Sequence, residues 1–165
     1  MYISGIEYDS LVDGRGIRNT LFVSGCKHYC EGCHNPSTWS FTNGYEFTLV
    51  KQDEFIQKCK ENPLLDGITL SGGDPLYHAK ELLPFICRYK EVNPSHNIWI
   101  YTGFTFEQIL LNCDMYSLVK ECDVLVDGPF ILKLRDLNLK FKGSSNQRII
   151  DINKSIQLGK VILYN

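Results

Sequence analysis

Four short apolar segments, each followed by glycine, alternate with helical segments along this chain. They are rich in β-branched and aromatic residues and bounded by turn formers, which is typical of strands; they cover residues 18–24, 66–71, 97–102 and 123–127. Residues 50–61 and 81–92 place apolar side chains on one helical face, and residues 105–108 fit a capping box that opens another helix. Because strands that alternate with helices form parallel βαβ units, the sequence predicts an α/β fold with a mostly parallel sheet.

The length of the chain limits how far such a sheet can close. A complete eight-stranded (β/α) barrel takes about 250 residues, and this chain has 165. We therefore expect a partial, open barrel. No repeat or linker marks a boundary, so residues 1–165 are expected to form one domain. The open side of such a barrel has room for a bulky substrate such as a loop of another protein. Pro84 is expected to lie in the first turn of the second helix or to bend it.

The glycines that follow the four predicted strands indicate a ligand-binding rim. Glycine permits tight turns and lets backbone approach a ligand closely. In parallel α/β folds, ligands bind at the carboxyl ends of the strands. The residues expected at this rim are Gly25, Gly72, Gly73, Gly103 and Gly128.

Composition narrows the class of protein. The net charge is −2, which gives no sign of nucleic-acid binding, and we find neither a secretion signal nor an apolar stretch of membrane-spanning length. The sequence thus predicts a soluble, cytoplasmic protein, in which the seven cysteines stay reduced. Four scattered cysteines are expected to be buried or incidental thiols: Cys59, Cys87, Cys113 and Cys122.

The other three cysteines, Cys26, Cys30 and Cys33, form a C-x3-C-x2-C motif directly after the first predicted strand. Thiolates so close in sequence can bind one soft metal centre, and iron–sulfur clusters are held by cysteine thiolates. Three thiolates on a four-iron cluster would leave one iron open for a small molecule, as catalytic metal sites do. The alternative is a structural zinc site with His28 or His34 as the fourth ligand. The motif alone leaves both interpretations open.

The cysteine motif and later blocks together resemble the radical S-adenosylmethionine superfamily, and within it the activating proteins of anaerobic, class III ribonucleotide reductases. The resemblance covers most of the chain and rests on residues 13–18 (DGRGIR), 33–39 (CHNPSTW), 71–76 (SGGDPL), 99–103 (WIYTG), 124–130 (VLVDGPF) and 143–148 (GSSNQR).

This resemblance implies a 4Fe-4S cluster on Cys26, Cys30 and Cys33, with S-adenosylmethionine on the remaining iron. Gly72 and Gly73 would contact the cofactor through backbone carbonyls, and Asp74 would shape their loop or add a charge-assisted bond. Further implied contacts are Gly32 and His34 beside the last ligand, Tyr101, Thr102 and Asp127 near adenosine or ribose, and Arg148, which either pairs with the methionyl carboxylate or is a solvated surface residue. Asn35 and Trp39 would support and cover the site.

The implied function is the reductive cleavage of S-adenosylmethionine to place a glycyl radical on the reductase. The implied partners are the large subunit of the reductase and a small electron-transfer protein or other reductant. Arg15 stands where the family more usually has proline. His34 stands where many members have tyrosine, and C-H-N also occurs in other glycyl-radical activators. An activator of a formate-lyase-type enzyme and a non-enzymatic zinc-binding interaction module therefore stay as alternatives.

Overall fold

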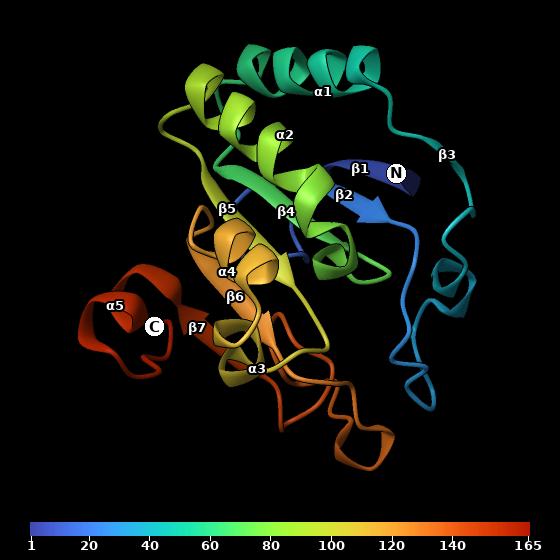
Figure 1. Ribbon diagram of the computed structural model, residues 1–165, viewed down its shortest axis with the longest axis vertical. Helices are drawn as coiled ribbons and strands as arrows, with labels where there is room; N and C mark the ends of the chain where they lie inside the picture. The colour runs from blue at the N-terminus through green and yellow to red at the C-terminus, as the bar shows by residue number, and fades with distance from the viewer.

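A seven-stranded sheet forms the centre of the computed structural model, which describes residues 1–165 (Figure 1). The strand order is β3-β1-β2-β4-β5-β6-β7. The four central strands are mutually parallel and match the four predicted ones: β2 (Arg18–Val23), β4 (Gly67–Gly72), β5 (Asn97–Tyr101) and β6 (Val124–Asp127). Three antiparallel strands extend the two ends of the sheet: β1 (Tyr2–Ser10), β3 (Tyr45–Glu46) and β7 (Arg148–Asp151). The sheet ends at β3 and β7 without closing, so the predicted α/β fold with an open, partial barrel is confirmed.

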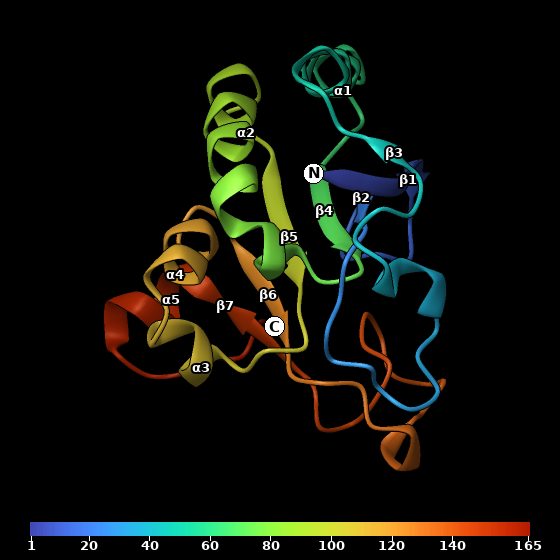
Figure 2. The same ribbon diagram turned by 45° about the vertical axis from the view of Figure 1, so that its right-hand side comes forward.

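Helices cover one face of this sheet. The α-helices are α1 (Leu49–Glu61), α2 (Ala79–Val92), α3 (Phe106–Leu110), α4 (Cys113–Val119) and α5 (Ile152–Leu158). Figures 1 and 2 show α2 and α4 along the same side of β5 and β6. Buried side chains of α1, α2 and α4 form one core with alternate strand residues such as Leu70, Ile100 and Leu125. Because side chains alternate between the two faces of a strand, Trp99, Val124 and Val126 lie on the opposite face of β5 and β6, where they form a second small cluster.

Two predicted details of the helices have different outcomes. Thr105 does form a capping box with Gln108 at the start of α3. The helix α2 begins at Ala79 because a 3-10 turn, η2 (Pro75–His78), leads directly into it. This start places Pro84 inside the helix and beyond its first turn, so the first-turn position is wrong.

The cysteines outside the motif divide by burial. Cys59 and Cys122 are buried and Cys87 and Cys113 are exposed, and all seven cysteines are free thiols. None of the helices is both long enough and apolar enough to pass through a lipid bilayer.

Candidate functional site

A cavity of about 740 Å³ opens where the parallel strands end. Its volume falls within the range of small-molecule sites, about 300–1,000 Å³. The loops that follow β2, β4, β5 and β6 all contribute to its lining, at the lower end of the sheet in Figure 1. It brings together fourteen of the residues singled out in the sequence: Cys26, His28, Cys30, Gly32, Cys33, His34, Asn35, Trp39, Gly72, Gly73, Tyr101, Thr102, Gly103 and Gly128. Gly25, the fifth predicted rim glycine, is not part of the lining.

The cysteine motif lies in the irregular loop that follows β2. Tyr29 and Gly32 have positive φ values of 49° and 71°, and the Cys33 N–H donates to the Cys30 carbonyl at 3.1 Å. These turns fold the segment back on itself, so that all three cysteines line the same cavity. Tyr29 also packs edge-on against Trp39, with the ring centroids 5.3 Å apart.

The three thiols fit an iron–sulfur cluster by their chemistry and their shared cavity. No group of three or more histidine, cysteine, aspartate or glutamate side chains is placed to hold a single metal ion. The ligands of one zinc ion lie about 2.0–2.3 Å from the metal, whereas the thiolates of a four-iron cluster bind separate irons and stand farther apart. Burial raises the pKa of Cys26 to about 11, and the His28 backbone N–H offsets part of this effect. Metal binding at Cys26 must therefore displace a proton.

The glycine pair at the end of β4 packs directly against the cysteine loop. Gly73 N–H donates to the Val23 carbonyl at 2.7 Å, and a Cβ at Gly73 would lie 2.6 Å from the backbone oxygen of Gly25. Gly72 has a φ of 100°, and a Cβ there would lie 2.5 Å from the Val23 oxygen. Only glycine fits such close backbone contacts without a shift of the chain. The pair is therefore held beside the cysteines, with both glycines on the cavity wall.

Asp74 is a buried hub that joins three loops of the site. Its side chain is 1% exposed and accepts hydrogen bonds from His28 Nε2 at 2.7 Å, Thr102 Oγ1 at 2.8 Å and Gly103 N–H at 2.9 Å. It also accepts from Leu76 N–H at 2.9 Å. Asp74 does not line the cavity. Its side chain links the glycine loop to the cysteine loop through His28 and to the segment after β5 through Thr102 and Gly103, and its role towards the cofactor stays a prediction.

Burial also affects two hydrogen-bond donors at the end of β5, the Tyr101 phenol and the Thr102 hydroxyl. It raises the pKa of the Tyr101 phenol, which keeps this cavity-lining group protonated. Thr102 is 6% exposed and lies on the cavity wall, with its hydroxyl directed to Asp74.

Asp127 and Arg148 lie outside the cavity lining. Arg148 Nε donates to Asp127 Oδ1 at 3.0 Å, and its two terminal nitrogens bond Glu107 at 3.0 and 2.8 Å. Asp127 is 1% exposed and also accepts from Phe106 N–H, at the start of α3. The Arg148 side chain is 33% exposed, and its hydrogen bonds to Asp127 and Glu107 join α3, β6 and β7.

We expect Arg148→Met to lower the free energy of unfolding by about 3 kcal/mol, because it leaves the Asp127 carboxylate buried without its partner. Arg148 also lowers the pKa of Glu107 to about 2 from an ordinary 4.5. The Glu107 contribution is therefore complete above pH 4.5 and lost as the pH falls towards 2. Urea unfolding of both proteins across this range checks the prediction. Equal stability at pH 7 would contradict it.

Sequence reasoning missed two parts of the cavity wall. Asp13 lies there, with its carboxylate held by Ser10 Oγ at 2.7 Å and Thr20 Oγ1 at 3.0 Å. Several residues between 130 and 147 form the wall beyond β6. Asp13 and residues 143–147 belong to blocks that carry the family resemblance, which was their only signal. In residues 137–142 apolar and polar side chains alternate, a period typical of strands, but the structure forms no strand there, so this period gave no signal of a cavity wall.

Comparisons with known proteins agree with this geometry. The family model described as "4Fe-4S single cluster domain" matches residues 12–150. The anaerobic ribonucleoside-triphosphate reductase-activating protein of Haemophilus influenzae is 41% identical over 142 residues, which cover 84% of this chain and 90% of the relative. The protein of that name from Escherichia coli (strain K12) is 41% identical over 140 residues, or 83% of this chain and 90% of its own. The one from Enterobacteria phage T4 is 39% identical over 140 residues, or 84% and 86%.

These matches decide between the alternatives that the sequence left open. The matched domain is a four-iron cluster domain rather than a zinc module. The relatives are named as activators of a ribonucleotide reductase rather than of a formate-lyase-type enzyme. With 4Fe-4S chemistry matched from residue 12 to 150 and relatives aligned over more than four-fifths of its length, the chain belongs to the family of anaerobic ribonucleoside-triphosphate reductase-activating proteins.

Proposed function

We propose that this chain uses S-adenosylmethionine to generate a glycyl radical on an anaerobic ribonucleoside-triphosphate reductase. The observation that carries the proposal is that three cysteines and a close-packed glycine pair line one open cavity. Cys26, Cys30 and Cys33 would hold a 4Fe-4S cluster and leave one iron for the cofactor. When bound, the cluster supplies the electron that cleaves S-adenosylmethionine into methionine and a 5′-deoxyadenosyl radical, which takes a hydrogen atom from the glycine.

The chain's own residues bind and orient the cofactor. Backbone carbonyls of Gly72 and Gly73 can accept hydrogen bonds from its ammonium group, because no side chains stand in the way. Tyr101 and Thr102, at the end of the neighbouring strand, line the same cavity and would contact the adenosine or ribose. Gly32 and His34 flank the last thiolate on the same wall.

Asp74, Asp127 and Arg148 lie outside the cavity lining and support the loops that form it. Asp74 fixes the glycine loop against the cysteine loop through His28. Asp127 and Arg148 fix the ends of α3, β6 and β7. In this proposal all three residues support the site and leave cofactor contact to the cavity-lining groups.

The partners follow from the chemistry of the reaction. The substrate glycine belongs to another protein, so the cavity must admit a loop of the reductase while water is kept from the radical. A small electron-transfer protein or another reductant must also supply one electron per cleavage.

The experiment that tests this function is an anaerobic incubation with two candidate substrates. The iron-loaded protein, a reductant and S-adenosylmethionine are mixed with the reductase or with a formate-lyase-type enzyme. We expect 5′-deoxyadenosine, methionine and a glycyl-radical doublet in the spin-resonance spectrum of the reductase only. A doublet on the lyase and none on the reductase would contradict the proposal.

A further inference from the structure

Residues 131–142, here called the rim loop, are ordered without being covered. The loop includes a short 3-10 helix, η3 (Leu132–Leu134). Ser145 N–H donates to the Leu134 carbonyl at 2.9 Å, Ile131 N–H donates to Ser144 Oγ at 3.2 Å, and Arg135 forms a bridge with Ser144. These bonds fix the path of the backbone. The side chains therefore stand on a scaffold that is already formed.

Four apolar side chains of the rim loop face water, whereas Phe141 packs against Trp99. Every residue from 131 to 138 is exposed. Leu137 is 84% exposed, and Ile131, Leu132 and Leu134 are 39, 40 and 41% exposed. Leaving four large apolar side chains of an ordered segment in water forgoes their burial energy. Such a patch marks an interaction site.

The charge of the rim loop is opposite to that of the chain. It carries four basic residues and one acidic residue, Asp136, whereas the whole chain has a net charge of −2; the basic residues are Lys133, Arg135, Lys140 and Lys142. A complementary surface would therefore combine apolar side chains with acidic ones. Such complementarity speeds encounter and selects partners.

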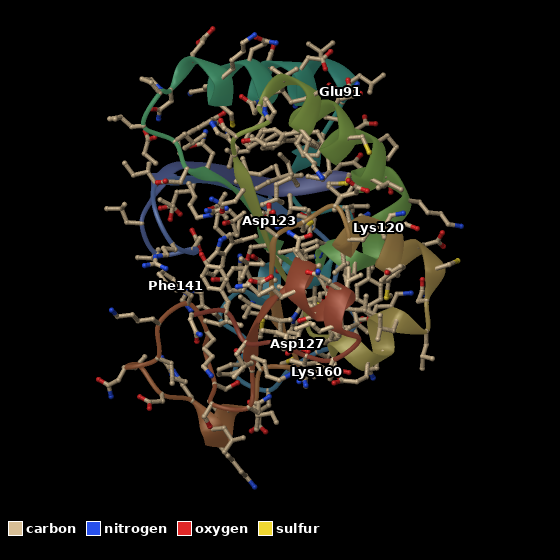
Figure 3. All side chains as sticks on the ribbon, turned by 90° about the vertical axis from the view of Figure 1, so that its left-hand side faces the viewer. Glu91, Lys120, Asp123, Asp127, Phe141 and Lys160 are labelled. Carbon is tan, nitrogen blue, oxygen red and sulfur yellow. The ribbon has the colours of Figure 1, made fainter.

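The rim loop stands at the mouth of the cavity, next to the cysteine loop. Arg135, Leu137 and Lys142 line the cavity. A Cβ at Gly32 would lie 2.8 Å from Leu132 Cδ1, so the two loops touch. Figures 1 and 2 both show the orange η3 beside the blue cysteine loop, and in Figure 3 its side chains project from the lower edge of the molecule.

We propose that the rim loop is the docking surface for the reductase, which would present an acidic and apolar patch beside its radical glycine. This inference rests on the proposed function, because a glycine inside a protein must be held at this cavity during hydrogen transfer. A protein reductant needs only to come near the cluster, whereas the substrate glycine must enter the cavity that the rim loop lines.

The test is a charge reversal that spares the cavity wall. Lys133 and Lys140 are exposed and do not line the cavity. We expect Lys133→Glu with Lys140→Glu to raise the reductase concentration that gives half-maximal glycyl radical by about tenfold, with dithionite as the reductant. S-adenosylmethionine cleavage without the reductase should stay unchanged. Added salt should weaken the native pair more than the variant pair. The matched control is Lys60→Glu with Lys120→Glu, two exposed lysines on α1 and at the end of α4.

Three outcomes would overturn the docking role. One is an unchanged half-maximal concentration, and another is a defect that appears only when a protein reductant replaces dithionite. The third is a loss of cleavage without the reductase, which would place the effect in the cavity itself. A failure of the proposed function looks different, because the native protein would then form no glycyl radical on the reductase at any concentration.

Discussion

Replacing Cys30 with alanine should leave a folded protein that holds no four-iron cluster and forms no glycyl radical. Cys30 is one of three thiols on the same cavity wall, and no nearby cysteine can replace it, because the other four cysteines lie outside that wall. Three thiolates already leave one of the four irons without a protein ligand, and the two thiolates that remain in the variant would leave two irons without one, too few ligands to retain the cluster. Iron and sulfide analysis after anaerobic reconstitution, with the visible absorption spectrum, measures the loss.

The matched control is Cys113→Ala. Cys113 is exposed, is the first residue of α4 and is remote from the cavity lining. This variant should keep full iron content and activity. A complete cluster in Cys30→Ala, or the loss of the cluster in Cys113→Ala, would show that the ligands have been assigned wrongly.

Asp74→Asn should keep the cluster but reduce S-adenosylmethionine cleavage by about 10–100-fold. The Asp74 carboxylate accepts from four protein donors, and an amide NH₂ in place of one oxygen would face donors instead. The glycine loop would then shift relative to the cysteine loop. The measurements are the cleavage rate and the change that the cofactor causes in the spin-resonance spectrum of the reduced cluster. The change should be weaker in the variant.

Two further variants keep this prediction testable even if Asp74→Asn folds poorly. His28→Gln removes the link to the cysteine loop and leaves the bonds from Thr102 and Gly103 in place, and it should show the same weakened response to the cofactor. Asp123→Asn is the control, because Asp123 caps the opposite end of the sheet through Ile98 N–H (Figure 3). A normal spectral response in His28→Gln and Asp74→Asn would contradict the positioning role.

The parts of the fold that the sequence predicted are those with strong local signals. The central strands combine apolar runs with a following glycine, so the prediction placed each of their ends to within one residue. The strands β1 and β7 escaped notice because each has a mixed polar and apolar pattern, as in Tyr2–Ser10, and lacks the apolar run of the central strands. Their place depends on pairing with β2 and β6, which no local window reports.

In the candidate site, too, the residues with local sequence signals could be predicted and those with distant partners could not. The cysteines and the glycine pair form contiguous motifs and could be predicted. The bonds of Asp74 to His28 and Thr102 span 46 and 28 residues of sequence, and those of Arg148 to Asp127 and Glu107 span 21 and 41. Such partners are set by how the strand ends meet in space. The roles of Asp74 and Arg148 could therefore be judged only from the structure.

The most direct test of this account is the spin-resonance spectrum of the reconstituted and reduced protein, recorded with and without S-adenosylmethionine. The account places a cluster with one open iron and the cofactor in the same cavity, so the spectrum should be that of a four-iron cluster and should change when the cofactor is added. A colourless protein that holds one zinc ion, or a cluster spectrum that the cofactor leaves unchanged, would contradict it.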